Sequence, residues 1–213
     1  MVLPPLRRLL PDGALRLVAG LPTAVVLRGV LGAAFFGAEA YLPLSLTRLH
    51  HGSPTQVGIP LTVAALGWAS GAWWQGRHAA RTGPLVPLRA GLVLVAVGVG
   101  ALTVLTIDSV SLWAALPIWI VAGGGMGLAM PTVSVLTMSL SPESEHGANA
   151  SALQVSDMVG SILGIALAAT VVASLGLARL DSALLIVDSA LASVALVGAA
   201  LCARAVRGTA AST

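Results

Sequence analysis

Long apolar runs separated by short polar segments constrain this chain more than any other feature. Each run is long enough to cross the roughly 30 Å of membrane hydrocarbon, which takes about 20 residues as a helix. The strands of a membrane barrel alternate in polarity over about ten residues, whereas these runs are continuous and longer. The sequence therefore predicts an all-α, polytopic membrane protein with six transmembrane helices. The six runs cover about residues 22–48, 54–76, 85–106, 110–138, 148–176 and 181–203.

Composition supports the same class. Of the 213 residues, 57% are hydrophobic and 9% are charged, whereas a soluble domain has about 25% charged residues. Such a chain has too few polar side chains to cover a surface that faces water. The net charge of +3 rests on few charges and does not indicate a nucleic-acid partner. The single cysteine, Cys202, excludes an internal disulfide and a cysteine-based metal cluster.

The arginines predict the orientation. With six spans, nine of them fall on one side of the membrane, and only Arg48 and Arg179 fall on the other. Cytoplasmic loops carry the excess of positive residues, so both termini are expected in the cytoplasm, with the chain integral to the plasma membrane. The nine are Arg7, Arg8, Arg16, Arg28, Arg77, Arg81, Arg89, Arg204 and Arg207. The expected division is a cytoplasmic N-terminal segment (1–21), a six-helix bundle (22–205) and a short cytoplasmic tail (206–213).

Glu39 lies in the middle of the first apolar run. It is about 17 Å along a helix from Arg28, and the two residues share a face because eleven residues make almost three turns. A charge at the membrane centre costs on the order of 3 kcal/mol and usually faces a polar cavity. We interpret Glu39 as a binding group for a coupling proton or a cationic substrate. The alternative is a structural hydrogen bond between helices, with Glu39 protonated.

A second polar cluster lies in the fifth run. Gln154, Asp157, Ser161 and Gly164 follow one another at intervals of three and four, so they form one stripe on a helix. The stripe is typical of a helix that lines a cavity. The alternative is close helix contact through Gly160 and Gly164, and both can hold on different edges of one helix.

The fourth run contains the sequence AGGGMGLAMPT. Gly123, Gly124, Gly125, Gly127 and Pro131 make this helix easy to bend, or alternatively allow a neighbour to approach closely. The glycines do not indicate a phosphate-binding loop, because no strand precedes them and no Lys-Ser/Thr pair follows.

The remaining ionisable residues do not point to catalysis. Asp188 is expected near enough to the outer boundary to stay hydrated. The four histidines are expected in loops, without a buried nucleophile or metal-ligand spacing nearby, so neither an enzyme nor a metal site is expected. These histidines are His50, His51, His78 and His146.

The segment GWASGAWWQGRHAARTG, which covers the end of the second run and the polar residues after it, has a distinctive shape. It resembles the weaker, second-half copy of the cytoplasmic loop signature of the major facilitator superfamily, and Gly71, Arg77, Arg81 and Gly83 match that signature. In that family the glycines permit close helix contact and the arginines connect helix ends electrostatically. The acidic residue that often precedes the first arginine is missing here, because Gln75 and Gly76 occupy those positions, so an acid–arginine latch is not expected at this loop.

Three further runs resemble the same family in order. RGVLGAAFFGAEAYLPLSL, GGGMGLAMPT and NASALQVSDMVGSILGIAL are similar to the seventh, tenth and eleventh helices of actinobacterial-type drug exporters, and the N-terminal 20 residues resemble the end of the central linker. The resemblance implies the C-terminal six-helix half of a transporter whose substrate lies between two halves. It therefore implies a second six-helix half as partner, either a second copy of this chain or a separate chain, besides the lipid bilayer and a small-molecule substrate.

The same resemblance implies export of small amphiphilic compounds coupled to proton influx, by alternating access and without a cofactor. Glu39 would carry the proton, Arg28 would be a gate or counter-charge, and Gln154 and Asp157 would line the path. Two alternatives remain: a non-transporting membrane module, and facilitated uptake of a nutrient such as a sugar. The second fits poorly with an aromatic content of 4%, because sugar sites usually stack on rings.

Overall fold

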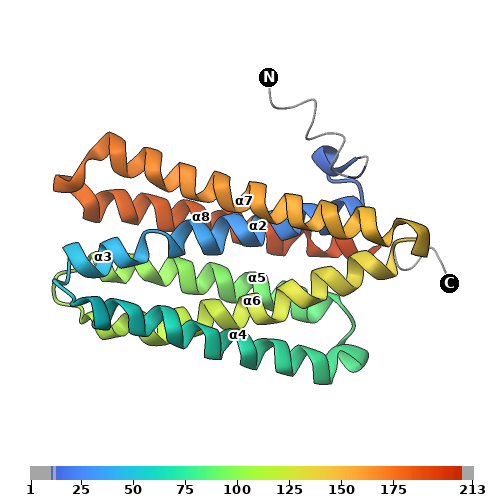
Figure 1. Cartoon of the computed structure of the whole chain (residues 1–213), viewed down its shortest axis with the longest axis horizontal. Helices are drawn as coiled ribbons and strands as arrows, with labels where there is room; N and C mark the ends of the chain where they lie inside the picture. The colour runs from blue at the N-terminus through green and yellow to red at the C-terminus, as the bar shows by residue number, and fades with distance from the viewer. Residues whose placement is uncertain (1–10, 12, 208–213) are drawn as a thin grey trace.

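The computed structural model describes residue 11 and residues 13–207, and this part of the chain is an all-helical bundle (Figure 1). Arg7, Arg8 and most of the expected tail lie outside the described residues. The α-helices are α2 (Leu21–Glu39), α3 (Leu42–Arg48), α4 (Pro54–Thr82), α5 (Leu85–Ala101), α6 (Ala115–Ser139), α7 (His146–Leu175) and α8 (Leu180–Val206). Short 3₁₀ turns are η1 (Ala14–Arg16), η2 (Leu102–Thr106), η3 (Leu112–Ala114), η4 (Glu143–Glu145) and η5 (Leu177–Arg179).

Five helical segments in the described residues are long and apolar enough to cross a membrane. They correspond to the first, third, fourth, fifth and sixth apolar runs. The remaining long helix, α4, has 29 residues and is long enough to cross, but it is less apolar than the other five. The prediction of an all-helical membrane protein is confirmed, and α4 is the least apolar of its six long helical segments.

The first span is a broken helix. α2 ends at Glu39, and α3 begins at Leu42. Pro43 has no N–H, so the carbonyl of Glu39 loses the donor that a continuous helix would supply. The backbone N–H of Tyr41 instead donates to the carbonyl of Ala38 at 3.1 Å, which tightens the chain at this point. Glu39 is therefore at the end of a helix and not inside an uninterrupted one.

α4 is longer than hydropathy predicts. It begins at a capping box in which Ser53 and Gln56 bond reciprocally, and it continues to Thr82. Gly83 then ends it with a φ of +64°, a conformation that favours glycine. The expectation that Arg77 and Arg81 follow the helix in a loop is wrong. Both lie on the last turns of α4, because a helix can continue into water beyond its apolar part.

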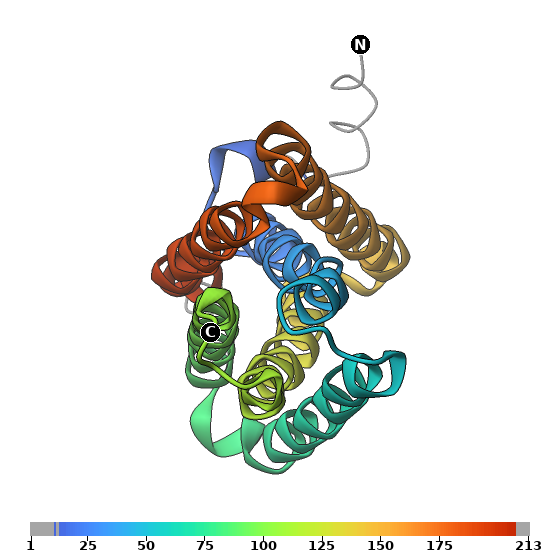
Figure 2. The same cartoon turned by 90° about the vertical axis from the view of Figure 1, so that its left-hand side faces the viewer.

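Apart from α5 and α6, helices that are neighbours in the sequence are not the main neighbours in space. α2 packs chiefly against α7 and α8, α4 against α6, and α5 against α6 and α8. Figure 2 shows the resulting arrangement end on, with α4 and α7 at outer corners and α2 and α6 between them. The surface formed by these four helices is called the α4–α7 face below. It brings the first, fourth and fifth apolar runs together.

The glycines of α6 face neighbouring backbones. A Cβ added to Gly123 or Gly127 would collide with carbonyl oxygens of Ala64 or Trp68 on α4, and one on Gly125 would lie 2.5 Å from the carbonyl oxygen of Gly91 on α5. Helix α6 runs unbroken through these residues and through Pro131. Close helix contact therefore accounts for these three glycines, whereas bending remains a prediction.

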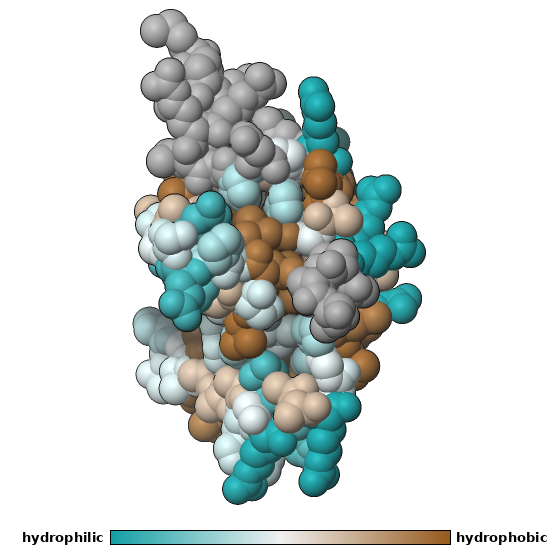
Figure 3. All heavy atoms as spheres, turned by 90° about the vertical axis from the view of Figure 1, so that its right-hand side faces the viewer, coloured by the Kyte–Doolittle hydropathy of each residue, from teal (hydrophilic) through white to brown (hydrophobic). Residues whose placement is uncertain are grey.

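The two ends of the bundle differ in charge. The end at which α2 and α7 begin and α4, α6 and α8 end is called the terminal end, and the opposite one the distal end. Figure 3 looks at the terminal end, where hydrophilic side chains surround a more hydrophobic centre. Exposed arginines at the terminal end are Arg16, Arg77, Arg81, Arg89, Arg204 and Arg207. Arg48 and Arg179 are exposed at the distal end, as the grouping of arginines by side predicts.

Candidate functional site

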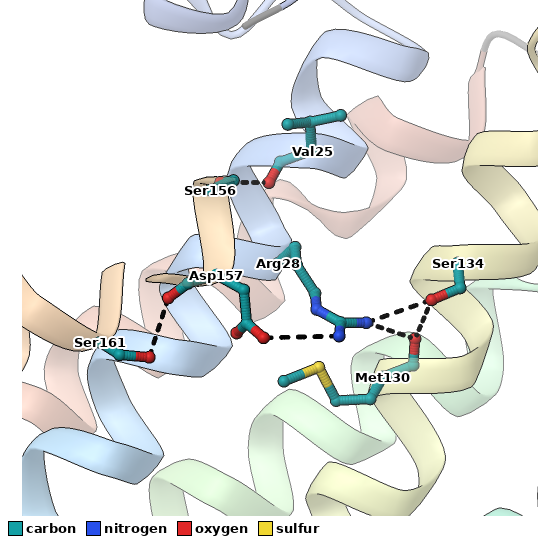
Figure 4. A network of polar contacts seen from close by, with 7 residues as sticks. All are labelled: Val25, Arg28, Met130, Ser134, Ser156, Asp157 and Ser161. Atoms are coloured by element: carbon teal, nitrogen blue, oxygen red, sulfur yellow. Dashed lines mark hydrogen bonds and ion pairs between the residues drawn. The ribbon is translucent and has the colours of Figure 1, made fainter. Parts of the chain in front are cut away.

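Arg28 joins three helices from its position on α2 (Figure 4). One terminal nitrogen, Nη1, donates to the backbone carbonyl of Met130 at 3.3 Å and to the Ser134 hydroxyl at 3.1 Å, both on α6. The other, Nη2, lies 3.4 Å from Oδ2 of Asp157 on α7. We call Arg28, Ser134 and Asp157 the arginine network. A single guanidinium thus connects the helices that form the middle and one corner of the α4–α7 face.

The arginine network is partly exposed and has unused hydrogen-bonding capacity. The side chains of Arg28 and Asp157 are each 16% exposed. Two of their buried polar atoms, Nε of Arg28 and Oδ1 of Asp157, have no hydrogen-bond partner. Because an unpartnered buried polar atom is costly, the pair retains capacity for one further donor and one further acceptor. A proton, a water molecule or a polar group of a ligand can supply such contacts.

Small residues bring α2 and α7 close enough for this ion pair. A Cβ added to Gly160 on α7 would collide with the carbonyl oxygen of Gly29 on α2, and one on Gly164 would collide with that of Ala33. The Ser156 hydroxyl donates across the same contact to the carbonyl of Val25 at 2.7 Å. The predicted small-residue contact is therefore confirmed. It holds Asp157 beside Arg28.

The other residues of the predicted stripe behave differently. Ser161 bonds its own helix at the carbonyl of Asp157, 2.8 Å away. Gln154 is exposed, and none of its polar atoms contacts the arginine network. Glu39 is half-buried at the end of α2 and makes no ion pair with Arg28, although the two share a helix. The counter-charge of Arg28 is Asp157, which lies four apolar runs further along the sequence.

The residues of the loop signature occupy two environments. Gly71 is buried against the backbone of Gly124 on α6, so a Cβ there would collide with a carbonyl oxygen. Arg77 is exposed and lies over the ring of Trp73, 4.5 Å from its centroid. Arg81 is exposed one turn further along, before Gly83. Among the described residues, neither arginine pairs with a carboxylate, consistent with the missing acid of the signature.

Asp188 is the ionisable residue that sequence reasoning misplaced. It was expected to be hydrated near the outer boundary, but it is buried, with 5% of its surface exposed. It faces the break between α2 and α3 across a small cavity. Residues on both sides of the break, Ala38 and Ser45, line the same cavity as Asp188.

The histidines offer no metal site in the described part of the chain, where no group of three His, Cys, Asp or Glu side chains could hold an ion. His78 lies within α4, and not in a loop as expected, stacked on Trp74 with ring centroids 4.7 Å apart. His146 is the first residue of α7, and its ring contacts the carbonyl of Ser141 at 3.1 Å.

The fold and the arginine network together define a polytopic helical membrane protein with a charged contact between helices on one face. A family model described as Major Facilitator Superfamily matches residues 3–165 of the chain. The chain therefore belongs to the major facilitator superfamily, whose members are membrane transporters of small molecules and not enzymes. A search of curated proteins finds no match to this chain.

Proposed function

We propose that this chain is the C-terminal half of a transporter that exports small amphiphilic compounds in exchange for protons. In this proposal the chain works with a second six-helix half, and substrate passes between the two halves by alternating access. Both termini are in the cytoplasm, and the plasma membrane is the site of action. The observation that carries the proposal is the arginine network, a charged and unsaturated contact on the α4–α7 face.

The location of the network supports a transport role. A charge within a membrane span is costly unless it faces a partner or a polar cavity. Arg28 and Asp157 neutralise each other, yet both stay partly exposed and each keeps one unpartnered atom. A purely structural ion pair would be more stable if these two atoms also had hydrogen-bond partners. The open atoms fit a contact that changes its partners as substrate or protons arrive.

Protonation provides a means of coupling. If Asp157 takes up a proton, its attraction to Arg28 is lost, and the link between α2 and α7 weakens. Glu39, half-buried at the end of α2, is the second carboxyl available for a coupling proton. A proton shifts the equilibrium between two states only if it binds one of them more tightly. In this proposal, Asp157 binds a proton less tightly while it is paired with Arg28 than after the pair has separated.

The test uses the cells that make the protein naturally, where any separately encoded half is present. Deletion of the gene is expected to raise retention of the fluorescent amphiphilic cation ethidium several-fold, and the wild-type gene restores efflux. Glu39→Gln and Asp157→Asn are expected to restore little or none, whereas Asp181→Asn, an exposed position on α8, restores it fully. An ionophore that dissipates the proton gradient should abolish efflux.

The opposite result is equally clear. If deletion leaves the retention of ethidium and of a panel of uncharged amphiphiles unchanged, the chain is a non-transporting membrane module. If efflux continues undiminished in Glu39→Gln and Asp157→Asn, neither carboxyl carries the coupling proton.

A further inference from the structure

A small cavity lies at the distal end, between α8 and the broken first span. It is lined by Asp188 and Leu184 of α8, by residues around the break, and by two leucines of η2. Its volume is about 10 Å³, which is the space that one water molecule needs. The remaining lining residues are Ala38, Tyr41, Leu42, Ser45, Leu102 and Leu105.

Two polar side chains in this lining have no partner. Asp188 and Ser45 are each 5% exposed, and among the described residues neither side chain makes a hydrogen bond or an ion pair. They come from different helices, α8 and α3, and border the same cavity. Buried polar groups in proteins are almost always bonded. A single water molecule in the cavity would satisfy both.

The surroundings leave Asp188 without a counter-charge. Among the residues that line the cavity, Tyr41 is the only other titratable group, and η2 contributes only leucines. Glu39 is on α2 next to Ala38 but does not line the cavity, and the ring of His50 is bonded to the carbonyl of Leu105 at 2.8 Å. No cation lines the site. An ionised carboxylate buried in this way costs several kcal/mol, so the group takes up a proton instead.

We propose that Asp188 is a proton-binding site, which holds its proton at neutral pH and shares one water molecule with Ser45. The proton is on the carboxyl, the water accepts from it, and the water donates to or accepts from the Ser45 hydroxyl. The site spans α8 and α3, so the proton is held only while these two elements stay in contact. Separation of α3 from α8 would admit bulk water and release it.

This binding claim stands independently of the transport proposal, and its test requires no transport. The full chain is purified in detergent, and the infrared C=O stretching band of protonated carboxyl groups is recorded at neutral and alkaline pH. The wild type is expected to show a band at neutral pH that is lost in Asp188→Asn. The matched control is Asp181→Asn, on the same helix but exposed, and it should leave the band unchanged.

A second variant tests the shared water. Ser45→Ala removes the hydroxyl and is expected to shift the Asp188 band to higher frequency, because the carboxyl loses part of its hydrogen bonding. This variant also keeps the test decisive if Asp188→Asn fails to fold. The proposal is overturned if Asp188→Asn removes an ionised carboxylate signal at neutral pH instead. An unshifted band in Ser45→Ala overturns the shared water.

Discussion

Asp157 and Asp188 are the same side chain in the same membrane bundle, yet their surroundings differ. Asp157 lies in the half of α7 that is nearer the terminal end. It is 3.4 Å from the guanidinium of Arg28 and is partly exposed. Asp188 lies toward the distal end of α8, is nearly fully buried, and faces an uncharged cavity. The first carboxylate therefore has a cationic partner, whereas no cation lines the cavity that the second one faces. Hydropathy alone cannot distinguish these two environments, because they differ in the side chains that neighbouring helices place beside each aspartate.

The largest expected effect comes from removing the partner of the paired aspartate. Arg28→Leu leaves Asp157 without its counter-charge and removes both hydrogen bonds that Arg28 donates to α6. We expect a loss of about 3 kcal/mol in the free energy of unfolding, near the lower limit for breaking a buried pair, because this pair is partly exposed. Unfolding in denaturing detergent, followed by circular dichroism, measures it.

The control for this change is the double variant Arg28→Leu/Asp157→Leu. It removes both charges together, so no uncompensated charge remains, and it should recover much of the lost stability. A double variant as unstable as Arg28→Leu alone would show that the contacts with Met130 and Ser134, and not the ion pair, hold the helices together.

An intermediate effect is expected from the contact that supports the ion pair. Gly160→Ala places a methyl group against the backbone of Gly29 and must push α7 away from α2. Crowding of this kind costs about 2 kcal/mol. Gly147→Ala is the matched control, because a Cβ at that position of α7 meets no atom within 4 Å. Equal melting temperatures for the two variants would contradict the close contact.

The smallest effect is expected at the unpaired aspartate. Asp188→Asn replaces a neutral carboxyl with a neutral amide of similar volume, so the unfolding free energy should change by less than about 1.5 kcal/mol at neutral pH. Asp157→Asn, which discards one charge of a pair, should cost more. The same detergent unfolding experiment compares them. A greater loss for Asp188→Asn would reverse the contrast between the two environments.

The sequence predicted the helical class and the approximate spans because apolar length is a local property. It missed the break after Glu39, although Pro43 carries the signal, because the apolar run continues through it. It also ended α4 too early, since hydropathy reports the membrane boundary and not the end of the helix. In both cases backbone hydrogen bonding decides where the helix ends, whereas the prediction relied on polarity alone.

Two residues of the arginine network, Arg28 and Asp157, were singled out from the sequence, whereas Ser134 was not. Arg28, Glu39 and Asp157 each stood out as charges in apolar surroundings. Their pairing depends on which helices touch, and a single sequence does not contain that information. The small residues Gly29 and Gly160 were a partial signal. Gly29 follows Arg28 directly, and Gly160 is about one helical turn from Asp157, as expected where two helices meet closely around a polar pair.

The distance along the chain between Arg28 and its partner has a consequence for biosynthesis. The two residues are 129 positions apart, and ribosomes add roughly 5–20 residues per second. Arg28 is therefore made on the order of ten seconds before Asp157. The Met130 carbonyl and Ser134 are made earlier than Asp157, so α6 is the first helix that can receive the arginine. Until α6 has been made, Arg28 lacks all the hydrogen-bond partners that it has in the folded bundle.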